Sequence, residues 1–457
     1  MELLSKLRDR SAVVSVIGLG YAGLPLAMAF ADAGFRVLGV DVNGERVSRL
    51  NAGETFIEDV TVERLRGHLA DGRFRATTEY AELAQADTIT ISVPTPLGPG
   101  HLPDLSFVER AVDALMPVLR RDQLVVLEST TYPGTSDEIV RPRLERTGLR
   151  VGDGYFLGFA PERIDPGGTT SGGLTFRQVP KLVAGATPRC LERVEALYSA
   201  IVDKVVPVSS LRAAEMAKLV ENAFRMVNVG FANEVALWCD QLGLDVWEVL
   251  DAAATKPFGF MAHYPGPGLG GHCIPVDPYY LVWKLKTLDY PARFIELAGE
   301  INRSMPAFVV SKVQAALERH GRPLRGSRVL VLGAAYKRDV ADTRESPSLD
   351  VMALLVEHGA LVDYNDPHVP SLTVRLSQRA LSHAEERLPS KEGAVRLESV
   401  DLWPAVEAAN CVVICTDHSA YEWETLAQRA RLIVDTRNAL RGISAASGDA
   451  LAEVVKL

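Results

Sequence analysis

One stretch decides the fold: residues 13–41 read VVSVIGLGYAGLPLAMAFADAGFRVLGVD. The β-branched run Val13–Ile17 ends at a glycine-rich turn, and the helical pattern Leu24–Ala33 follows before a second strand reaches Asp41. The turn, Gly18-Leu19-Gly20-Tyr21-Ala22-Gly23, is a GxGxxG motif between a strand and a helix, the context in which this motif binds a dinucleotide. Its glycines let the backbone approach a pyrophosphate at the helix N-terminus, where free N–H groups favour anions.

The residue that ends the second strand indicates which dinucleotide binds. Asp41 lies 18 residues after Gly23, and a carboxylate at this position bonds the adenosine ribose hydroxyls and repels a 2′-phosphate. The motif therefore predicts NAD rather than NADP. Arg46 follows nearby, and because an arginine there can accept a 2′-phosphate, it is a further cofactor-binding candidate.

Strand-like and helix-like segments alternate through the first half of the chain. Apolar runs at 88–93, 125–127 and 182–184 are separated by amphipathic stretches such as Phe107–Leu119, which predicts a parallel sheet covered by helices on both faces. Ligands of open parallel sheets bind beyond the carboxyl ends of the strands, so the residues after two of these runs are expected to contact cofactor or substrate. They are Pro94, Thr95 and Thr130. The alternative is that each is an ordinary turn residue with no contact to a ligand.

A long proline-free segment follows. From Ser209 to Leu242 the only interior glycine is Gly230, which predicts a single helix of about 30 residues, roughly 45 Å long, that joins two lobes or forms a dimer interface. Strand–helix alternation then resumes at residues 328–333, 361–364, 411–415 and 432–434, and the charged residues 371–400 suggest a surface insertion.

The predicted fold is α/β, with two Rossmann-like doubly wound parallel-sheet domains joined by a long central helix. Three parts are expected: an NAD-binding domain at 1–207, a central helical dimerisation domain with a cysteine loop at 208–305, and a C-terminal Rossmann-like domain at 306–457.

Composition narrows the function classes. The 457-residue chain has a net charge of −9, which disfavours non-specific binding to nucleic acid. Its five scattered cysteines argue against a disulfide framework and fit a reducing cytoplasm, with Cys411 and Cys415 expected to be buried in a strand. No cysteine or histidine pair has metal-site spacing, so no metal is expected. The apolar runs are of strand length, which predicts neither a signal peptide nor a membrane span.

The most informative loop surrounds a cysteine. Residues 264–278 read YPGPGLGGHCIPVDP, and a loop so rich in glycine and proline can hold the Cys273 thiol at a cleft, with a buried structural cysteine as the alternative. On the predicted long helix, Glu215, Lys218 and Asn222 share one face through their spacing. The lysine can supply charge or a proton and the asparagine a neutral donor, whereas a solvated helix face is the alternative.

Together these motifs resemble the UDP-glucose/GDP-mannose dehydrogenase superfamily from Gly18 to about Arg437. The family's motifs occur in order: VIGLGYAGLPLA, SVPTP, ESTTYPGT, PERIDPG, EMAKLVENAFRMVN, GPGLGGHCIPVDPYYL, YKRDVADTRESPS and VDTRN. The versions PERIDPG and GGHCIPVDPYYL are similar to the branch acting on UDP-N-acetylhexosamines, and closest to UDP-N-acetyl-D-glucosamine 6-dehydrogenases of bacterial surface-polysaccharide pathways. UDP-ManNAc and UDP-glucose are the alternative substrates.

The resemblance implies a chemistry on named residues. Cys273 aligns with a nucleophile that traps a 6-aldehyde as a thiohemiacetal, which a second NAD oxidises to a thioester before water releases the carboxylate. Lys218, Asn222 and Asp277 align with residues that handle protons and stabilise the oxyanion. Glu162 aligns with the carboxylate linked to thioester hydrolysis, and Thr130 with a residue that helps to place the water.

The resemblance also implies binding roles. The cofactor is NAD, two per turnover, with Arg344 as a further contact, and residues 306–457 bind the UDP-sugar in a homodimer built on the central helix. Two positions depart from the glucose branch: Pro166 replaces a second glutamate, and His272, which could lower the pKa of the thiol or only pack, replaces a serine. The expected substrate contacts are Glu162, Arg163, Lys218, Asn222, Tyr264, Gly266, Gly268, Gly270, Tyr336, Lys337 and Arg437.

Two other classes remain as alternatives. A two-electron β-hydroxyacid dehydrogenase of the 6-phosphogluconate type also joins a GxGxxG domain to a helix with K-x-x-x-N, but lacks the cysteine loop and the third α/β domain. A non-catalytic NAD-binding protein would not need so complete a set of catalytic residues.

Overall fold

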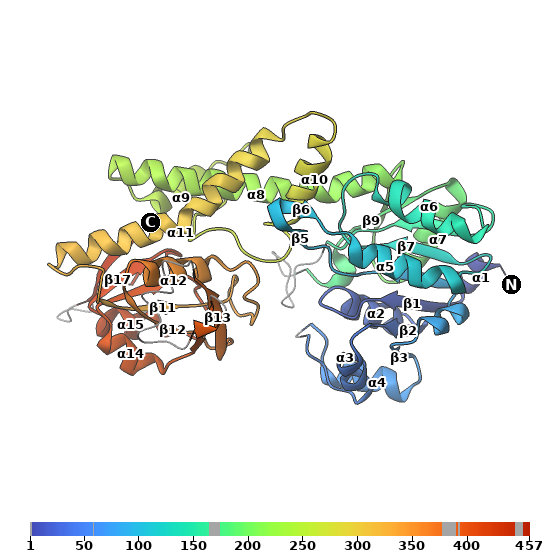
Figure 1. Ribbon diagram of the computed structural model, residues 1–457, viewed down its shortest axis with the longest axis horizontal. Helices are drawn as coiled ribbons and strands as arrows, with labels where there is room; N and C mark the ends of the chain where they lie inside the picture. The colour runs from blue at the N-terminus through green and yellow to red at the C-terminus, as the bar shows by residue number, and fades with distance from the viewer. Residues whose placement is uncertain (1, 58, 164–173, 377–389, 392–393, 444–450) are drawn as a thin grey trace. The chain divides into compact units, whose positions relative to one another are not determined.

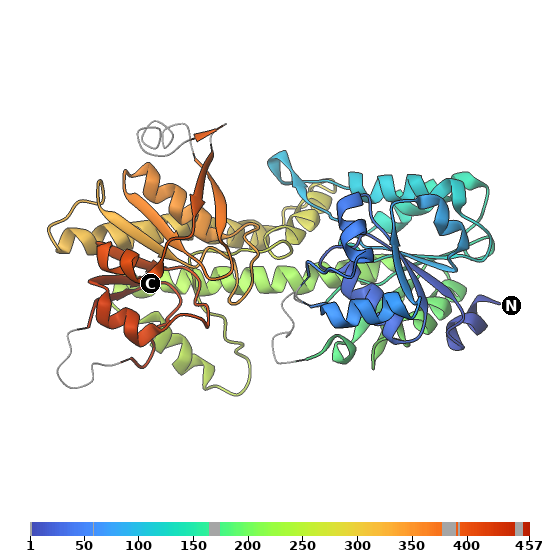
Figure 2. The same cartoon turned by 90° about the horizontal axis from the view of Figure 1, so that it is seen from below.

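The computed structural model describes residues 2–57, 59–163, 174–376, 390–391, 394–443 and 451–457 (Figures 1 and 2). The chain divides into two compact units. The first unit comprises Met1–Glu221 and Tyr279–Pro291, and the second comprises Asn222–Pro278 and Ala292–Leu457. The division of the sequence into three parts at residues 207 and 305 stays a prediction.

The first unit is built on an eight-stranded sheet with the order β10-β9-β8-β7-β4-β1-β2-β3. The predicted strands are present, but the sheet is not wholly parallel, because β8 pairs antiparallel with β9. The strands are β1 (Val13–Ile17), β2 (Arg36–Val40), β3 (Phe74–Thr77), β4 (Thr88–Ile91), β7 (Leu124–Leu127), β8 (Phe156–Phe159), β9 (Lys181–Gly185) and β10 (Val205–Pro207).

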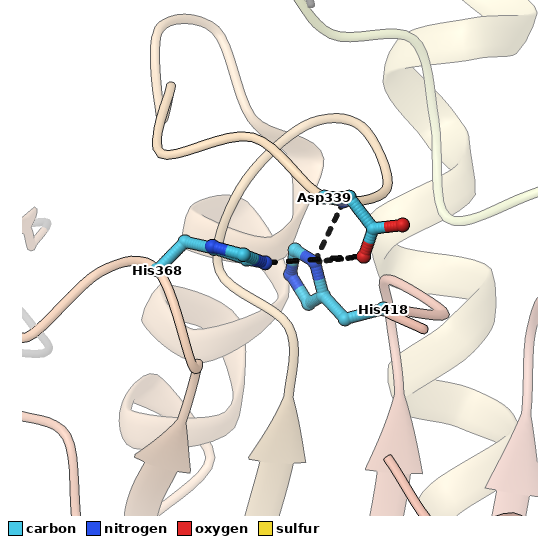
Figure 3. Close-up of side chains that lie close together, drawn as sticks. All are labelled: Asp339, His368 and His418. Atoms are coloured by element: carbon cyan, nitrogen blue, oxygen red, sulfur yellow. Dashed lines mark hydrogen bonds and ion pairs between the residues drawn. The ribbon is translucent and has the colours of Figure 1, made fainter. Parts of the chain in front are cut away.

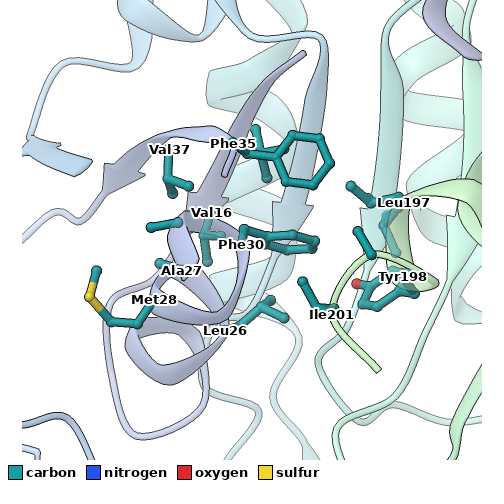
Figure 4. Packing of buried hydrophobic residues seen from close by; sticks show 14 of the residues in the cluster. Val16, Leu26, Ala27, Met28, Phe30, Phe35, Val37, Leu197, Tyr198 and Ile201 are labelled. Carbon is teal, nitrogen blue, oxygen red and sulfur yellow. The ribbon is translucent and has the colours of Figure 1, made fainter. Parts of the chain in front are cut away.

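Both faces of the sheet are covered at its central strands, which explains why β7 and β8 are apolar and buried at every residue. Successive side chains alternate: Leu124 and Val126 enter one apolar core, whereas Val125 and Leu127 enter the other. In the first core, Phe30 packs against Phe35 and Tyr198 (Figure 4). The helices of this unit are α1 (Leu3–Arg8), α2 (Gly23–Asp32), α3 (Gly44–Asn51), α4 (Val62–Ala70), α5 (Ser106–Leu115), α6 (Arg141–Leu144) and α7 (Pro188–Tyr198), and a small hairpin joins β5 (Leu97–Gly98) to β6 (Leu102–Pro103).

The predicted long helix is confirmed as α8, Leu211–Leu242, with 32 residues. It begins in the first unit and continues into the second. The Ser210 hydroxyl accepts the N–H of Ala213 at 3.2 Å and caps its start. A Cβ at Gly230 would lie 2.9 Å from that of Ala298, so α8 packs closely on a later helix there. The helices that follow are α9 (Val246–Ala254), α10 (Asp277–Lys286) and α11 (Arg293–Arg319).

The second unit holds a five-stranded parallel sheet with the order β12-β11-β16-β17-β18. Alternate side chains of β11 again enter different cores, Val329 and Val331 on one face and Leu330 and Leu332 on the other. Its elements are β11 (Arg328–Leu332), α12 (Pro347–Glu357), β12 (Leu361–Asn365), α14 (Leu402–Ala408), β16 (Cys411–Ile414), α15 (Trp423–Arg429), β17 (Leu432–Asp435) and β18 (Glu453–Lys456).

The predicted insertion at 371–400 contains strands. β13 (Ser371–Arg375) pairs antiparallel with β15 (Ala394–Glu398), and β14 (Ser390–Lys391) joins them. Within the predicted insertion, residues 377–389 and 392–393 lie outside the described residues. None of the helices in the described part of the chain combines the length and apolarity that crossing a bilayer requires.

Candidate active site

The glycine-rich turn has the geometry that its sequence predicts. Gly18 has a φ of 92°, and a Cβ there would lie 2.2 Å from the carbonyl oxygen of Ser92, so only glycine fits. A Cβ at Gly23 would lie 1.8 Å from the Gly18 carbonyl oxygen. At Gly20, by contrast, a Cβ would meet no atom within 4 Å. The turn is therefore tight at both ends and open at its middle glycine, where a ligand can approach the backbone.

Asp41 is buried at the end of β2 and is bonded to this turn. Its Oδ2 accepts the N–H of Leu19 at 2.8 Å and a guanidinium N–H of Arg46 at 2.9 Å, and its Oδ1 accepts the N–H of Asn43 at 2.9 Å. Arg46, the residue that could accept the 2′-phosphate of NADP, is thus paired with Asp41. A 2′-phosphate placed at this pair would meet the Asp41 carboxylate.

The two predicted strand-end loops lie side by side. The N–H of Val93 donates to the Ser129 hydroxyl at 2.9 Å, and that hydroxyl donates to the Val93 carbonyl at 2.7 Å. Pro94 is exposed, while Thr95 and Thr130 are half-buried. These residues therefore stand after the carboxyl ends of β4 and β7; β4 is next to β1, the strand that carries the glycine-rich turn, and β7 is one strand further along the sheet.

Residues predicted on one face of α8 are buried, so the alternative of a solvated face is wrong. Glu215, Lys218 and Asn222 are 0, 9 and 5% exposed. Glu215 accepts the N–H groups of Gly134 and Ser136 at 2.6 and 2.8 Å and so fixes the loop that follows Thr130. Burial raises the pKa of Glu215 to about 7, although these two N–H groups oppose the rise.

The Asn222 side chain is bonded to the cysteine loop. Its amide donates to Asp277 Oδ2 at 2.6 Å, and the N–H of Asp277 donates to the Cys273 carbonyl at 2.8 Å. Of the five cysteines, all in the described part of the chain, Cys273 alone is not buried, whereas Cys411 and Cys415 are buried in or next to β16 as predicted. The structure thus brings Cys273, Asp277 and Asn222 together within the second unit.

The glycines of the loop pack against residues that were predicted to contact the substrate. A Cβ at Gly266 would lie 2.6 Å from Nη1 of Arg437, and a Cβ at Gly270 would lie 2.6 Å from the Cβ of Tyr336. Gly268, with a φ of 141°, leaves a Cβ no room beside Pro347. Glycine is needed because the loop runs directly over these side chains.

Two buried asparagines that the sequence reasoning missed hold this loop. Asn233 on α8 accepts the N–H of Gly266 at 3.0 Å, and its amide donates to Asn302 on α11 at 2.8 Å. The amide of Asn302 donates in turn to the Met226 carbonyl at 3.3 Å. Mid-helix asparagines with no charge or motif carry no sequence signal, and their pairing becomes visible only when α8 and α11 lie together.

Two more of the predicted contact residues, Tyr264 and Arg344, bond to side chains of their own unit. The hydroxyl of Tyr264 donates to Asp251 at 2.8 Å, and its ring stacks on Trp247. The Arg344 guanidinium pairs with Asp342 at 2.6 Å. The pKa of Asp342 is lowered: burial works against the shift, and the hydrogen bonds from Arg344, with a smaller contribution from His272, outweigh it. His272 is therefore close enough to the Asp342 carboxylate to affect its pKa.

A buried histidine anchors the loop that carries Tyr336 and Lys337. His418 Nδ1 accepts the N–H of Asp339 at 2.9 Å, so its proton lies on Nε2, which is 3.0 Å from Oδ2 of Asp366. The same Asp366 oxygen accepts the N–H groups of Ala334 and Ala335 at 2.7 and 3.0 Å. Both ends of this loop segment are therefore fixed to the sheet of the second unit.

The same histidine belongs to a group with metal-like spacing. Asp339, His368 and His418 each offer a ligand atom within 4.8 Å of the others (Figure 3). Because His418 Nδ1 already accepts a backbone N–H, a metal would have to displace that bond. The group therefore fits an anchor for the loop better than a metal site, and the expectation that no metal takes part stays a prediction.

Known proteins resemble this chain over most of its length. The sequence matches the UDP-glucose/GDP-mannose dehydrogenase family over its NAD binding domain (residues 12–202), central domain (212–304) and UDP binding domain (330–442). UDP-N-acetyl-D-mannosamine dehydrogenase of Pyrococcus horikoshii is 34% identical over 94% of this chain and 96% of its own. NDP-N-acetyl-D-galactosaminuronic acid dehydrogenase of Ralstonia nicotianae is 34% identical over 93% and 95%.

A solved structure shows the same fold over almost the whole length. The UDP-D-ManNAc dehydrogenase structure from Pyrococcus horikoshii superposes with a TM-score of 0.83 at 32% identity, covering 97% of this chain and 98% of that one. The predicted α/β fold class is thereby confirmed.

Proposed function

Because the chain belongs to the UDP-glucose/GDP-mannose dehydrogenase family and is an NAD-dependent oxidoreductase, we propose that it oxidises the C6 alcohol of a UDP-N-acetylhexosamine to the carboxylate. One sugar, one water and two NAD give one uronate, two NADH and three protons. The observation that carries this proposal is the set of contacts around the half-buried Cys273, where Asn222 is bonded to Asp277 and Asp277 to the Cys273 carbonyl.

The first unit is the proposed NAD site. The turn Gly18–Gly23 offers an open approach at Gly20, and Asp41 offers a carboxylate for the adenosine ribose. Arg46, Pro94, Thr95 and Thr130 complete the proposed contacts of this unit, and Arg344 is a further proposed cofactor contact. When bound, NAD supplies the hydride acceptor for each of the two oxidations.

Covalent chemistry is assigned to the cysteine loop. The Cys273 thiolate adds to the aldehyde carbon, a C–S bond forms, and the aldehyde oxygen takes up the electron pair. The Asn222 amide, oriented by Asp277, and the charge of Lys218 stabilise that oxygen. Loss of the second hydride leaves a thioester on Cys273.

Hydrolysis is assigned to Glu162, with Thr130 helping to place the water. Water adds to the thioester carbonyl as Glu162 accepts its proton, the C–S bond breaks, and Cys273 leaves as a thiolate. The residues proposed to bind the nucleotide sugar are Arg163, Tyr264, Gly266, Gly268, Gly270, Tyr336, Lys337 and Arg437.

The proposal also concerns which epimer of the UDP-N-acetylhexosamine is the preferred substrate. The sequence motifs favour UDP-GlcNAc, whereas the relatives are named for UDP-N-acetyl-D-mannosamine and for NDP-N-acetyl-D-galactosaminuronic acid. Steady-state rates with UDP-GlcNAc, UDP-ManNAc, UDP-GalNAc and UDP-glucose test this directly. We expect kcat/KM for one N-acetylhexosamine to exceed that for UDP-glucose at least about tenfold, since a site built to bond an amide loses at least one hydrogen bond with glucose. A preference for UDP-glucose would contradict the assignment.

Two variants of one residue test the nucleophile. Cys273→Ser is expected to retain a covalent intermediate or to stall near one turnover, because an oxygen ester hydrolyses poorly. Cys273→Ala has no nucleophile and is expected to stop at the aldehyde with one NADH per sugar. Full steady-state turnover by Cys273→Ser would exclude the thioester pathway.

We also propose a homodimer built on α8, in the cytoplasm, where the five free cysteines would stay reduced. Phe224, Phe231 and Trp238 are exposed at seven-residue spacing along α8, a stripe that a second copy would cover. Phe231→Glu is expected to give a monomer in analytical ultracentrifugation, and Phe231→Leu to remain a dimer. A Phe231→Glu protein that stays dimeric would place the interface elsewhere.

A further inference from the structure

A buried lysine lies between two carboxylates in the first unit. Lys181, the first residue of β9, donates to Oε1 of Glu128 and, at 3.2 Å, to Oε2 of Glu162. Glu128 directly follows β7, and Glu162 lies three residues after the end of β8. The side chains of Lys181 and Glu128 are 4 and 0% exposed, whereas that of Glu162 is 18% exposed. Glu162 is thus the member of this group that reaches solvent.

The charges of the group are unbalanced. Lys181 bonds both carboxylates, and among the described residues the buried Oε2 of Glu128 has no hydrogen-bond partner. Burial raises the pKa of Glu128 to about 7, the charge of Glu162 adds to the rise, and Lys181 opposes it. Burial alone lowers the pKa of Lys181, but the two carboxylates raise it by more, so the lysine stays charged. The nearby ring of Tyr198 contributes a cation–π contact, with its centroid 5.3 Å from Nζ.

Structural stability alone does not account for this arrangement. A buried ion cluster is seldom more stabilising than apolar side chains of the same size, because each charge loses its hydration. The guanidinium of Arg163 is directed elsewhere, since it pairs with Glu221 at 2.8 Å and donates to the Pro180 carbonyl at 2.6 Å, although the backbone N–H of Arg163 donates to Oε1 of Glu162 at 2.6 Å. Lys181 is therefore a cation that a strand of the sheet holds against the other oxygen, Oε2.

We propose that Lys181 is a positioning residue for Glu162: its ammonium, 3.2 Å from Oε2, fixes the orientation of the carboxylate and faces its negative charge, and Glu128 holds Lys181 in place. This inference rests on the proposed function, in which the ionised Glu162 takes a proton from the water that attacks the thioester. A protonated Glu162 cannot do so. Lys181 therefore affects hydrolysis and leaves the two oxidations unaffected.

Two variants shift the hydrolysis step in opposite directions. In Lys181→Met combined with Glu128→Gln, the buried ammonium and the buried carboxylate that pairs with it are removed together, and Glu162 loses its bond to Lys181. Hydrolysis is expected to slow about 100-fold, within the range for loss of a positioned general base, and the acidic limb of its pH–rate profile moves to higher pH. In Glu128→Gln alone, Glu162 is the one carboxylate of the pair that remains beside Lys181, and the acidic limb of the pH–rate profile moves to lower pH.

Rapid mixing with NAD and sugar, followed by mass spectrometry of the quenched enzyme, separates the steps. The double variant is expected to keep the fast NADH burst and to accumulate an acyl group on Cys273. A burst that falls in proportion to kcat, with no acyl-enzyme and an unmoved acidic limb, would show a merely structural role and overturn the proposal. If the double variant does not fold, Glu128→Gln decides, because an unmoved acidic limb in that variant also overturns it.

Failure of the proposed function gives a different result. A wild-type enzyme that makes no NADH with any of the four UDP-sugars overturns both proposals. A wild-type enzyme that turns over through Cys273, with variants that hydrolyse the acyl-enzyme normally, overturns only the role of Lys181.

Discussion

Replacing the middle glycine of the dinucleotide turn by alanine separates binding from folding. In the protein alone a Cβ at Gly20 would meet no atom within 4 Å, and the backbone there does not have a positive φ. The Gly20→Ala protein should therefore fold normally, with a free energy of unfolding equal to wild type or up to about 1 kcal/mol higher, because alanine restricts the unfolded chain. Any loss must arise when the ligand is bound.

The expected loss is a weaker affinity for NAD. If the pyrophosphate lies against the Gly20 backbone, the added methyl group holds it away from the N–H groups of the turn. A dissociation constant raised about 10- to 100-fold corresponds to about 1.4–2.7 kcal/mol, the size of one or two lost charge-assisted hydrogen bonds. Gly18→Ala should behave differently, because its Cβ would lie 2.2 Å from Ser92 O at a φ of 92°, and it should lower the free energy of unfolding by more than about 1 kcal/mol.

Calorimetric titration with NAD and thermal unfolding without NAD measure the two effects separately. Gly67→Ala is the matched control, since Gly67 lies within α4 and a Cβ there also meets no atom within 4 Å. The control should bind NAD like the wild type. Unchanged NAD affinity in Gly20→Ala would refute the inference that the backbone of this turn carries the pyrophosphate.

Three further changes are predicted. Asp41→Asn removes the charge that repels a 2′-phosphate, so the ratio of kcat/KM with NADP to that with NAD should rise about tenfold; an unchanged ratio would mean that Asp41 does not set the cofactor preference. Glu215 has a folded-state pKa of about 7, above its unfolded value, so folding stability should fall by about 3 kcal/mol as the pH rises from 4.5 to 7, whereas Glu215→Gln should show a smaller fall in thermal unfolding across that range; parallel curves would contradict this assignment. His418→Phe removes the two bonds that His418 makes, to the N–H of Asp339 and to Asp366, and so frees the Asp339 end of the loop of Tyr336 and Lys337; KM for the UDP-sugar should rise about tenfold while NAD affinity stays unchanged, and an equal loss of both would indicate general misfolding.

The parts of the fold that could be predicted are those with a local sequence signal. β1, β2, β4, β7 and β9 lie where β-branched apolar runs predicted strands, and α8 lies where a long proline-free segment predicted a helix. β8 was missed because its sequence, FLGF, contains no β-branched residue, and β3 because it is short and partly polar. The antiparallel pairing of β8 with β9 could not be foreseen, because side-chain alternation carries no information about strand direction.

The same distinction holds for the site. The glycine-rich turn, Asp41 and the cysteine loop were found because each motif lies within a short stretch of sequence. Lys181 and Glu128 were not found, because they are 53 residues apart and single charged residues give no sign that they will be buried together. Their meeting depends on the order of β7, β8 and β9 in the sheet, which only the folded chain supplies.

Counting NADH against sugar consumed tests the central claim most directly. With wild-type enzyme, excess NAD and the preferred UDP-N-acetylhexosamine, two NADH per sugar and a uronate product are predicted, because the aldehyde is held on Cys273 until the second oxidation. One NADH per sugar with release of an aldehyde or ketone would contradict the thioester mechanism and indicate a two-electron dehydrogenase.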